Sequence, residues 1–245
     1  MKDNFSKQAA LYATYRPGYP TELFEFILQV TRGRSAAWDC ATGNGQTAKE
    51  LARYFERVVA TDISQQQLDN AEQAVNIFYS LQPAEQTNFP DNSFDLITIS
   101  QALHWLRFDD FYREVRRVAK NEAWIAAWMY GLIRISPEAD QLISDHHFQV
   151  LGKYWDSERK YVDDNYTTIP FPFEEIKCPE FRMQYEWTIE ELEGYLNTWS
   201  ALQKFIVVNG FNPVDKLISA IKGLSPNKKL GISFPLRLRM GRIDK

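Results

Sequence analysis

Two acids and a pair of glycines stand at a chemically informative spacing within residues 36–62. Asp39 lies near the end of one apolar run, and Gly43 and Gly45 follow in a short turn. Asp62 ends the next apolar run, 19 residues after Gly43. Glycines remove Cβ atoms where backbone must approach a ligand closely, and an acid about 20 residues further on is placed to hydrogen-bond a ribose. This spacing predicts a site for a ligand built on adenosine.

The turn differs from the Gly-x-Gly-x-x-Gly fingerprint that holds a dinucleotide pyrophosphate at a helix N-terminus. Gly45 is followed by Gln46, Thr47 and Ala48, so the third glycine is absent. A carboxylate at Asp39 would also repel a pyrophosphate and attract a cation. The pattern favours a ligand with an ammonium or sulfonium group, and a nicotinamide-dependent oxidoreductase is the weaker alternative.

These residues resemble the first motif of the class I S-adenosylmethionine-dependent methyltransferases (methyltransferase type 11), which is an acid followed by spaced glycines. Ala41 stands where that family usually has its first glycine. The resemblance implies S-adenosyl-L-methionine as cofactor. The cofactor-binding residues expected in this segment are Asp39, Ala41, Gly43, Gly45, Asp62 and Ile63.

Asp62 allows two interpretations. Its carboxylate can accept both ribose hydroxyls while Ile63 packs against the adenine face. Alternatively, it is an acid that stabilises the dipole of a following helix, because Ser64 with Gln67 three residues on is a capping-box start. The matching distance to the glycine pair favours the ribose role.

A second segment of resemblance runs from Ala84 and Glu85 through residues 88–95. It is similar to the family segment that leads from the adenine-contacting loop into the fourth strand. In that alignment, Glu85 or the backbone near Ala84 receives the adenine amino group. A solvated glutamate in a polar loop is the alternative.

The third segment, residues 100–105, follows an apolar run at the end where open α/β sheets bind ligands. It resembles the Gln-Ala-x-His-Trp sequence of the subfamily that includes trans-aconitate methyltransferases. The resemblance implies that Gln101 touches the cofactor and that His104 and Trp105 face the reacting methyl group. His104 is the candidate catalytic residue, either as a general base or as a neutral ring that orients the loop. Transfer to a carboxylate would need no base.

The two ends of the chain also carry aromatic and basic residues. Residues 12–20 resemble the amino-terminal segment of the same subfamily, which suggests that Tyr15 and Arg16 lie near the cofactor carboxylate or the substrate. Packing of tyrosine rings against the first helix is equally open. Arg237 and Arg239 are expected on one face of a terminal strand. Either one of them pairs with a substrate carboxylate, or both are solvated charges of an edge strand.

These residues require a scaffold in which strands and helices alternate. The apolar patterns predict strands at 36–40, 57–61, 77–81, 94–100, 122–129, 181–187 and 232–240. Helices are predicted at 20–30, 45–55, 64–76, 109–119, 138–152, 189–208 and 213–222. Continuous apolar strands between helices predict an α/β fold with a doubly wound, mostly parallel sheet. The resemblance implies seven strands in a Rossmann-like arrangement with a helical cap insertion.

The length of 245 residues fits a single methyltransferase domain. We expect an N-terminal cap segment and a cofactor-binding core, then a lid or cap insertion, and finally strands and helices that complete the sheet. These parts are expected at residues 1–35, 36–130, 131–175 and 176–245, respectively.

The composition of the chain limits the classes of partner that we expect it to bind. The 28 basic and 32 acidic residues leave a net charge of −4, which does not favour a nucleic-acid partner. The two cysteines and three histidines form no metal-binding pattern. No apolar stretch is long enough to span a bilayer, so we expect a cytoplasmic monomer or homodimer without membrane contact.

The resemblance implies transfer of a methyl group from S-adenosylmethionine to a small-molecule acceptor. The aromatic residues of the cap and the scattered arginines favour a carboxylic acid or an amphipathic metabolite as that acceptor. A protein that binds or senses the cofactor without transferring its methyl group is the alternative function.

Overall fold

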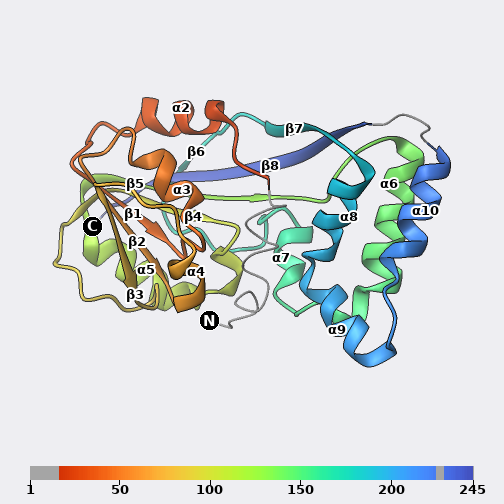
Figure 1. The fold of residues 1–245 in the computed structure, drawn as a ribbon. Coiled ribbons are helices and arrows are strands. Elements are labelled where there is room, and N and C mark those ends of the chain that lie inside the picture. Colours follow the sequence, from red (N-terminus) through yellow and green to blue (C-terminus); the bar gives the residue numbers. More distant parts are fainter. Residues whose placement is uncertain (1–16, 225–228, 245) are drawn as a thin grey trace.

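The computed structural model describes residues 17–224 and 229–244. Within these residues the strands form one eight-stranded sheet in the order β3-β2-β1-β4-β5-β8-β6, with β7 paired to β8 outside this path (Figure 1). The strands are β1 (Ala36–Cys40), β2 (Arg57–Asp62), β3 (Ile77–Leu81), β4 (Phe94–Ser100), β5 (Ala119–Tyr130), β6 (Glu174–Ile176), β7 (Phe181–Trp187) and β8 (Leu230–Arg242). The expected doubly wound, mostly parallel fold is confirmed.

The sheet has a parallel and an antiparallel half. Strands β1 to β5 pair in parallel, whereas β8 runs antiparallel to β5, β6 and β7. The final strand is therefore not at an edge, and that expectation was wrong. Alternation of apolar and polar residues indicates which face of a strand is buried. Whether a strand lies at an edge depends on the pairing of its backbone N–H and C=O groups, which the residue pattern does not show.

Helices cover both faces of the parallel half. One apolar cluster contains Leu23 and Ala37, and a second contains Trp38, Phe111 and Val115. The helices beside the sheet are α2 (Thr21–Val30), α3 (Gln46–Leu51), α4 (Gln65–Asp69) and α5 (Phe108–Val118). Apolar burial on both faces explains why β1, β2 and β4 are almost continuously apolar.

Two of these helices are shorter than predicted. The helix expected at 64–76 ends at Asp69, where Asn70 leaves helical geometry and bonds back to the Gln66 carbonyl. The helix expected at 45–55 ends at Leu51, and Asn76 bonds the carbonyls of Ala52 and Phe55 beyond that end. Side-chain amides therefore satisfy backbone groups near the ends of both helices, where apolar spacing alone predicted further turns.

A helical lobe lies beyond one end of the sheet (Figure 1). Its helices are α6 (Pro137–Asp145), α8 (Ile189–Asn197), α9 (Ser200–Asn209) and α10 (Val214–Leu224), with α7 (Arg159–Asp163) between the lobe and the sheet. The helix expected at 138–152 continues from α6 as a π-helical turn, η3 (His146–Val150), followed by the short turn η4 (Gly152–Tyr154). Helices α8 and α10 pack with each other, and α10 packs with α6, so residues 189–224 build the lobe, in which α8 also contacts β7.

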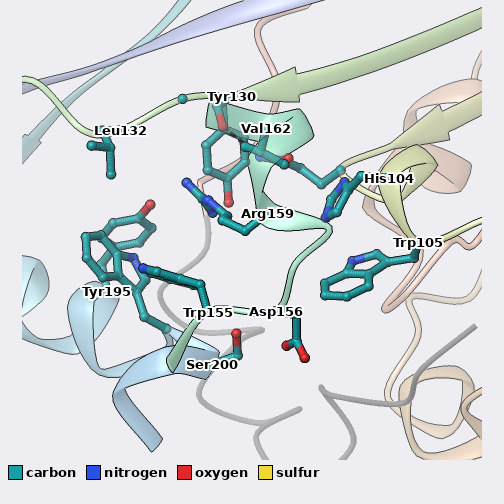
Figure 2. A pocket seen from close by; sticks show the side chains of 13 residues that line it. His104, Trp105, Tyr130, Leu132, Trp155, Asp156, Arg159, Val162, Tyr195 and Ser200 are labelled. Atoms are coloured by element: carbon teal, nitrogen blue, oxygen red, sulfur yellow. Dashed lines mark hydrogen bonds between the residues drawn. The ribbon is translucent and has the colours of Figure 1, made fainter. Parts of the chain in front are cut away.

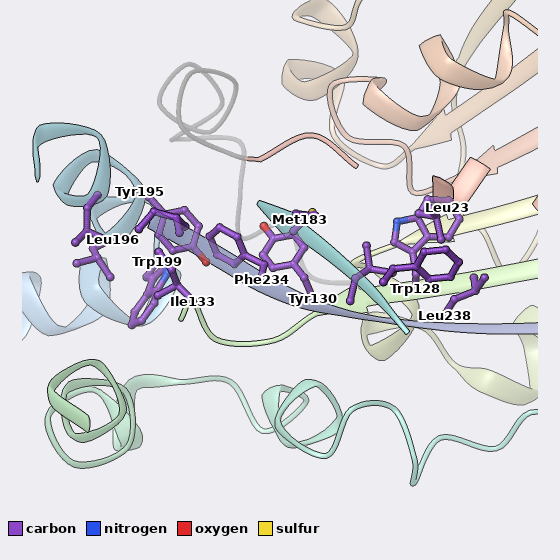
Figure 3. Packing of buried hydrophobic residues seen from close by; sticks show 14 of the residues in the cluster. Leu23, Trp128, Tyr130, Ile133, Met183, Tyr195, Leu196, Trp199, Phe234 and Leu238 are labelled. Carbon is purple, nitrogen blue, oxygen red and sulfur yellow. The ribbon is translucent and has the colours of Figure 1, made fainter. Parts of the chain in front are cut away.

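The lobe and the sheet share one core. Aromatic and aliphatic side chains continue without a break from Trp128 in β5 to Trp199 in the lobe (Figure 3). The ring of Phe234 lies 5.4 Å from that of Tyr130 and 5.2 Å from that of Tyr195, measured between centroids. This shared packing fixes the lobe against the carboxyl ends of the strands. Within the described residues, every helix is too short or too polar to cross a membrane.

Candidate active site

The turn after β1 has an unusual backbone. Ala41, Gly43 and Gly45 all have positive φ, at 52°, 57° and 81°. A Cβ added at Gly43 would meet no atom closer than 3.9 Å, whereas one added at Gly45 would collide with the Tyr79 hydroxyl. Gly43 therefore faces open space, as expected for backbone that approaches a ligand, while Gly45 is also needed for packing.

Asp39 stabilises this turn through hydrogen bonds of its buried side chain. Its side chain is fully buried and accepts hydrogen bonds from the hydroxyls of Thr42 and Thr98. Burial raises the pKa of Asp39 to about 7, although both threonine hydrogen bonds favour the charged form. The carboxylate ties the turn to β4 and is not exposed on the surface.

Asp62 joins the turn to the next helix. Its carboxylate accepts hydrogen bonds from the backbone N–H of Gly43 and of Ser64, both at 2.9 Å. Ser64 in turn accepts from the Gln67 N–H, so the expected helix start at Ser64 is confirmed. Asp62 and the half-buried Ile63 thus stand at the carboxyl end of β2 beside the glycine turn.

Glu85 is not a solvated loop residue. It is 8% exposed, and its Oε1 accepts from the Arg107 N–H at 3.3 Å and lies 3.8 Å from the Arg107 guanidinium. Ala84 beside it is also buried. Ala84 belongs to the apolar cluster that contains Trp38 and Phe111, and Glu85 contacts Arg107, the residue that precedes α5.

Gln101 connects the ends of two strands. It has a φ of +54°, its N–H donates to the Trp128 carbonyl at 2.8 Å, and its side-chain amide donates to the Tyr130 carbonyl at 3.2 Å. The preceding residue, Ser100, lies 3.2 Å from the Thr47 hydroxyl of α3, measured between side-chain oxygens. Gln101 therefore lies between the glycine turn and α3 on one side and the carboxyl end of β5 on the other.

His104 lies in the short turn η2 (Leu103–Trp105) and is 7% exposed. Its Nδ1 is 2.8 Å from the hydroxyl of Tyr166. Burial, and to a smaller extent the charge of Arg159, lowers the pKa of His104 to about 3. The ring is therefore neutral at physiological pH. The Trp105 ring packs 4.8 Å from it, between centroids.

A cavity opens between the carboxyl ends of β4 and β5 and the helical lobe (Figure 2). Its walls come from four separate stretches of the chain and are rich in aromatic side chains. The lining residues are Gln101, His104, Trp105, Tyr130, Gly131, Leu132, Trp155, Asp156, Arg159, Val162, Tyr195, Trp199 and Ser200. The Gln101–Trp105 segment, singled out from sequence, thus faces a cavity.

Arg159 is the only cation among the described residues that line this cavity. Its guanidinium stacks 4.8 Å from the centre of the Trp155 ring, and its Nε donates to Asp163 at 3.0 Å. That is the one hydrogen bond of the guanidinium within the described residues, so the two terminal nitrogens remain for a ligand. Asp156, the nearby acid, is paired with Lys204 at 2.7 Å.

The arginines chosen from sequence lie elsewhere. Arg239 holds the protein's own Glu175 through two hydrogen bonds of 2.9 and 2.8 Å and is mostly buried, so it is not a solvated edge charge. Arg237 is exposed. Neither arginine is among the described residues that line the cavity. Arg159 does line it, but the sequence analysis did not identify Arg159, because only the general aromatic richness of residues 131–175 pointed to this region. Tyr15 and Arg16 lie outside the described residues.

Comparison with known proteins agrees with this geometry. A family model described as "Methyltransferase domain" matches residues 38–127. A Dictyostelium discoideum protein named as a methyltransferase is 32% identical over 249 positions, which cover 98% of this chain and 95% of that protein. A solved Anaeromyxobacter dehalogenans structure, described as a type II methyltransferase, has a TM-score of 0.86 and 36% identity and covers 94% of this chain and 99% of its own.

A more distant neighbour shares the fold. The phosphoethanolamine N-methyltransferase 2 of Haemonchus contortus, solved with S-adenosylhomocysteine, has a TM-score of 0.51 at 16% identity and covers 98% of this chain and 58% of that chain. The fold and the glycine turn define an open α/β methyltransferase. The chain belongs to the class I S-adenosylmethionine-dependent methyltransferases and is an enzyme of that family.

Proposed function

We propose that this enzyme transfers the methyl group of S-adenosylmethionine to a carboxylate of a small molecule, as a member of the trans-aconitate methyltransferase-like subfamily. The observation that carries the proposal is Arg159, whose guanidinium enters an aromatic cavity beside Gln101 and His104 (Figure 2). A guanidinium is the side chain best suited to hold a carboxylate, because its donors form a planar fork. The Gln101–Trp105 sequence supports the subfamily.

The residues on the other side of Gln101 fit the cofactor. Three positive-φ positions within five residues leave backbone exposed to an open space at Gly43, and Asp62 stands at the adjoining strand end. When bound, the cofactor supplies a methyl group activated by a positively charged sulfur. We assign its binding to Tyr15, Arg16, Asp39, Ala41, Gly43, Gly45, Asp62, Ile63, Ala84, Glu85 and Gln101, with Asp39 acting through the turn that it supports.

The chemistry of a carboxylate acceptor needs no proton transfer. One carboxylate oxygen forms a bond to the methyl carbon while the carbon–sulfur bond breaks and its electron pair stays on sulfur. The products are a methyl ester and a neutral thioether, so no proton is left to remove. The protein has to hold the acid through Arg159, align it, and exclude water with aromatic side chains such as Trp155 and Tyr195.

The test is a turnover assay with methyl-labelled cofactor and matched acceptors. Mono-, di- and tricarboxylic acids are compared with their amides and with phenols, amines and thiols of similar size. We expect label in an extractable product that alkali hydrolyses, as it does a methyl ester, and only with the acids. Turnover confined to phenols, amines or thiols would overturn the carboxylate proposal. Label retained in stoichiometric amount without any product would fit a sensing protein.

A further inference from the structure

We infer that Tyr166 fixes His104 as a hydrogen-bond donor toward the methyl acceptor, so that His104 orients the acceptor and does not remove a proton from it. Tyr166 is then a positioning residue that acts through His104. The identity of the acceptor rests on the proposed function, whereas the state of the His104 ring does not.

The groups around the Tyr166 hydroxyl determine the direction of its hydrogen bond to His104. Tyr166 is fully buried, and its hydroxyl lies 2.8 Å from His104 Nδ1. The other groups that approach this oxygen are the backbone amides of His104 and Leu103, which are donors. Burial raises the pKa of Tyr166, so the phenol keeps its proton. Within the described residues Nδ1 is the acceptor available for that proton, and a buried hydroxyl without an acceptor is costly.

The direction of this bond sets the tautomer of His104. A neutral imidazole carries one N–H, so a ring that accepts at Nδ1 carries its hydrogen on Nε2. Nε2 is the remaining polar atom that the ring can present to the cavity. A protonated Nε2 can donate to an acceptor oxygen but cannot take a proton from it. A carboxylate acceptor can accept from such a donor and needs no base.

The loop that carries Tyr166 is held in a conformation that chains seldom adopt. Asn165 and Tyr166 have φ values of +53° and +60°, and such backbone persists only where its surroundings enforce it. Arg239 supplies that support, because its Nη1 donates to the carbonyls of Tyr166 at 2.9 Å and Ile169 at 2.7 Å. Its guanidinium also stacks 4.6 Å from the centre of the Phe171 ring.

The first experiment measures the tautomer in the full chain without any acceptor. Long-range proton–nitrogen correlation spectra of ¹⁵N-histidine-labelled protein, with His104 assigned by its replacement, distinguish a protonated Nε2 from a protonated Nδ1. We expect His104 in the Nε2–H form, and a mixture or a shift toward Nδ1–H in Tyr166→Phe. Tyr161→Phe, which removes a hydroxyl from the adjacent α7, should leave the signal unchanged. A wild-type ring protonated at Nδ1 would overturn the inference.

The second experiment separates a donor from a base by turnover on the acceptor found in the labelled assay. His104→Gln places an amide N–H near the position of Nε2, so it should keep kcat within about tenfold of wild type, whereas His104→Ala should lose more. Tyr166→Phe should raise KM about tenfold with little change in kcat. A base predicts equal losses in His104→Gln and His104→Ala. If no acid is methylated, the carboxylate proposal fails while the spectra still decide the tautomer.

Discussion

The two sides of the proposed active site, the cofactor side and the acceptor side, are built in different ways. The proposed cofactor side is centred on the backbone of one turn, Ala41–Gly45, in which the Gly43 N–H donates to the carboxylate of Asp62. The proposed acceptor cavity uses side chains from four stretches, and one of them, His104, contacts the buried Tyr166 across 62 positions of sequence. Local sequence therefore encodes most of the proposed cofactor side, whereas tertiary packing creates the proposed acceptor side.

The two sides also differ in charge. Asp62 and Glu85 place acids beside the glycine turn, whereas the described lining of the acceptor cavity has Arg159 as its cation, an Asp156 that is paired with Lys204, and a neutral His104. An acidic side suits a positively charged sulfur, and a cationic side suits an anionic acceptor. Substitutions in either side should therefore affect one ligand and spare the other.

The largest expected effect concerns Asp39 and stability. Its pKa is raised from 3.8 to about 7 in the folded protein, so the folded chain binds a proton more readily than the unfolded chain. This contribution to stability is fully present below pH 3.8 and is lost as the pH rises through 7, on the order of 4 kcal/mol in all.

Asp39→Asn removes this titration while keeping a side chain of the same shape. The unfolding free energy of the variant, relative to wild type, should increase between pH 5 and pH 8 in urea titrations. The threonine contacts that this substitution alters do not titrate, so they cancel when the two pH values are compared. Equal pH dependence in both proteins would show that Asp39 is not protonated in the buried site.

Arg159→Ala tests the acceptor side. Loss of a charge-assisted hydrogen bond should raise KM for the acid by about 100-fold. The affinity for S-adenosylhomocysteine, measured by calorimetry, should stay unchanged. Arg237→Ala is the matched control, because Arg237 is exposed on β8 and is not among the described lining residues. A parallel loss of cofactor affinity would break the division between the two sides.

The strands and the cofactor turn could be predicted from sequence because their signals are local. The bounds of β1, β3, β4 and β7 match the predicted ranges, since each is a short run with strand-like residues between turn signals. Gly43 and Asp62, predicted from spacing alone, are hydrogen-bonded to each other. Local pattern was thus enough wherever the contacts join adjoining elements.

The acceptor side could not be predicted in the same way. Arg159 is positioned by stacking on the Trp155 ring and by the location of α7 between the sheet and the lobe. Tyr166 contacts His104 from a loop whose Tyr166 carbonyl accepts a hydrogen bond from Arg239, 73 positions further along the chain. Neither residue lies in a periodic segment or a motif, so the sequence contains no local signal for its role.

Asp62→Ala tests the cofactor side with a smaller expected effect. The affinity for S-adenosylhomocysteine should weaken by about 1 to 3 kcal/mol, because a charged hydrogen-bond acceptor is lost and the Gly43 N–H loses its partner. Asp62→Asn keeps one acceptor oxygen and should lose less. KM for the acid should be unchanged in both variants. Unchanged cofactor affinity in Asp62→Ala would argue against the ribose assignment.

The smallest effect is expected at Ala41. A non-glycine residue at a φ of +52° is strained by about 1 to 2 kcal/mol. Glycine removes that strain but makes the unfolded chain more flexible, so Ala41→Gly should stabilise the protein by a net of about 0.5 to 1 kcal/mol in urea titrations. Destabilisation by Ala41→Gly would mean that the Ala41 methyl group contributes more through packing than its backbone strain costs.

Gly43→Ala is the reciprocal change in the same turn. Its φ is +57°, and a methyl group there would meet no atom closer than 3.9 Å, so backbone strain, partly offset by a less flexible unfolded chain, should destabilise the protein by a net of about 0.5 to 1 kcal/mol. The methyl group would also occupy the open space where the cofactor backbone contact is expected, and calorimetry should show weaker binding of S-adenosylhomocysteine. Because Ala41→Gly adds no atom to that space, it should leave the same affinity intact. A loss of affinity in Ala41→Gly as large as in Gly43→Ala would show that flexibility of the turn, and not the space above Gly43, controls binding.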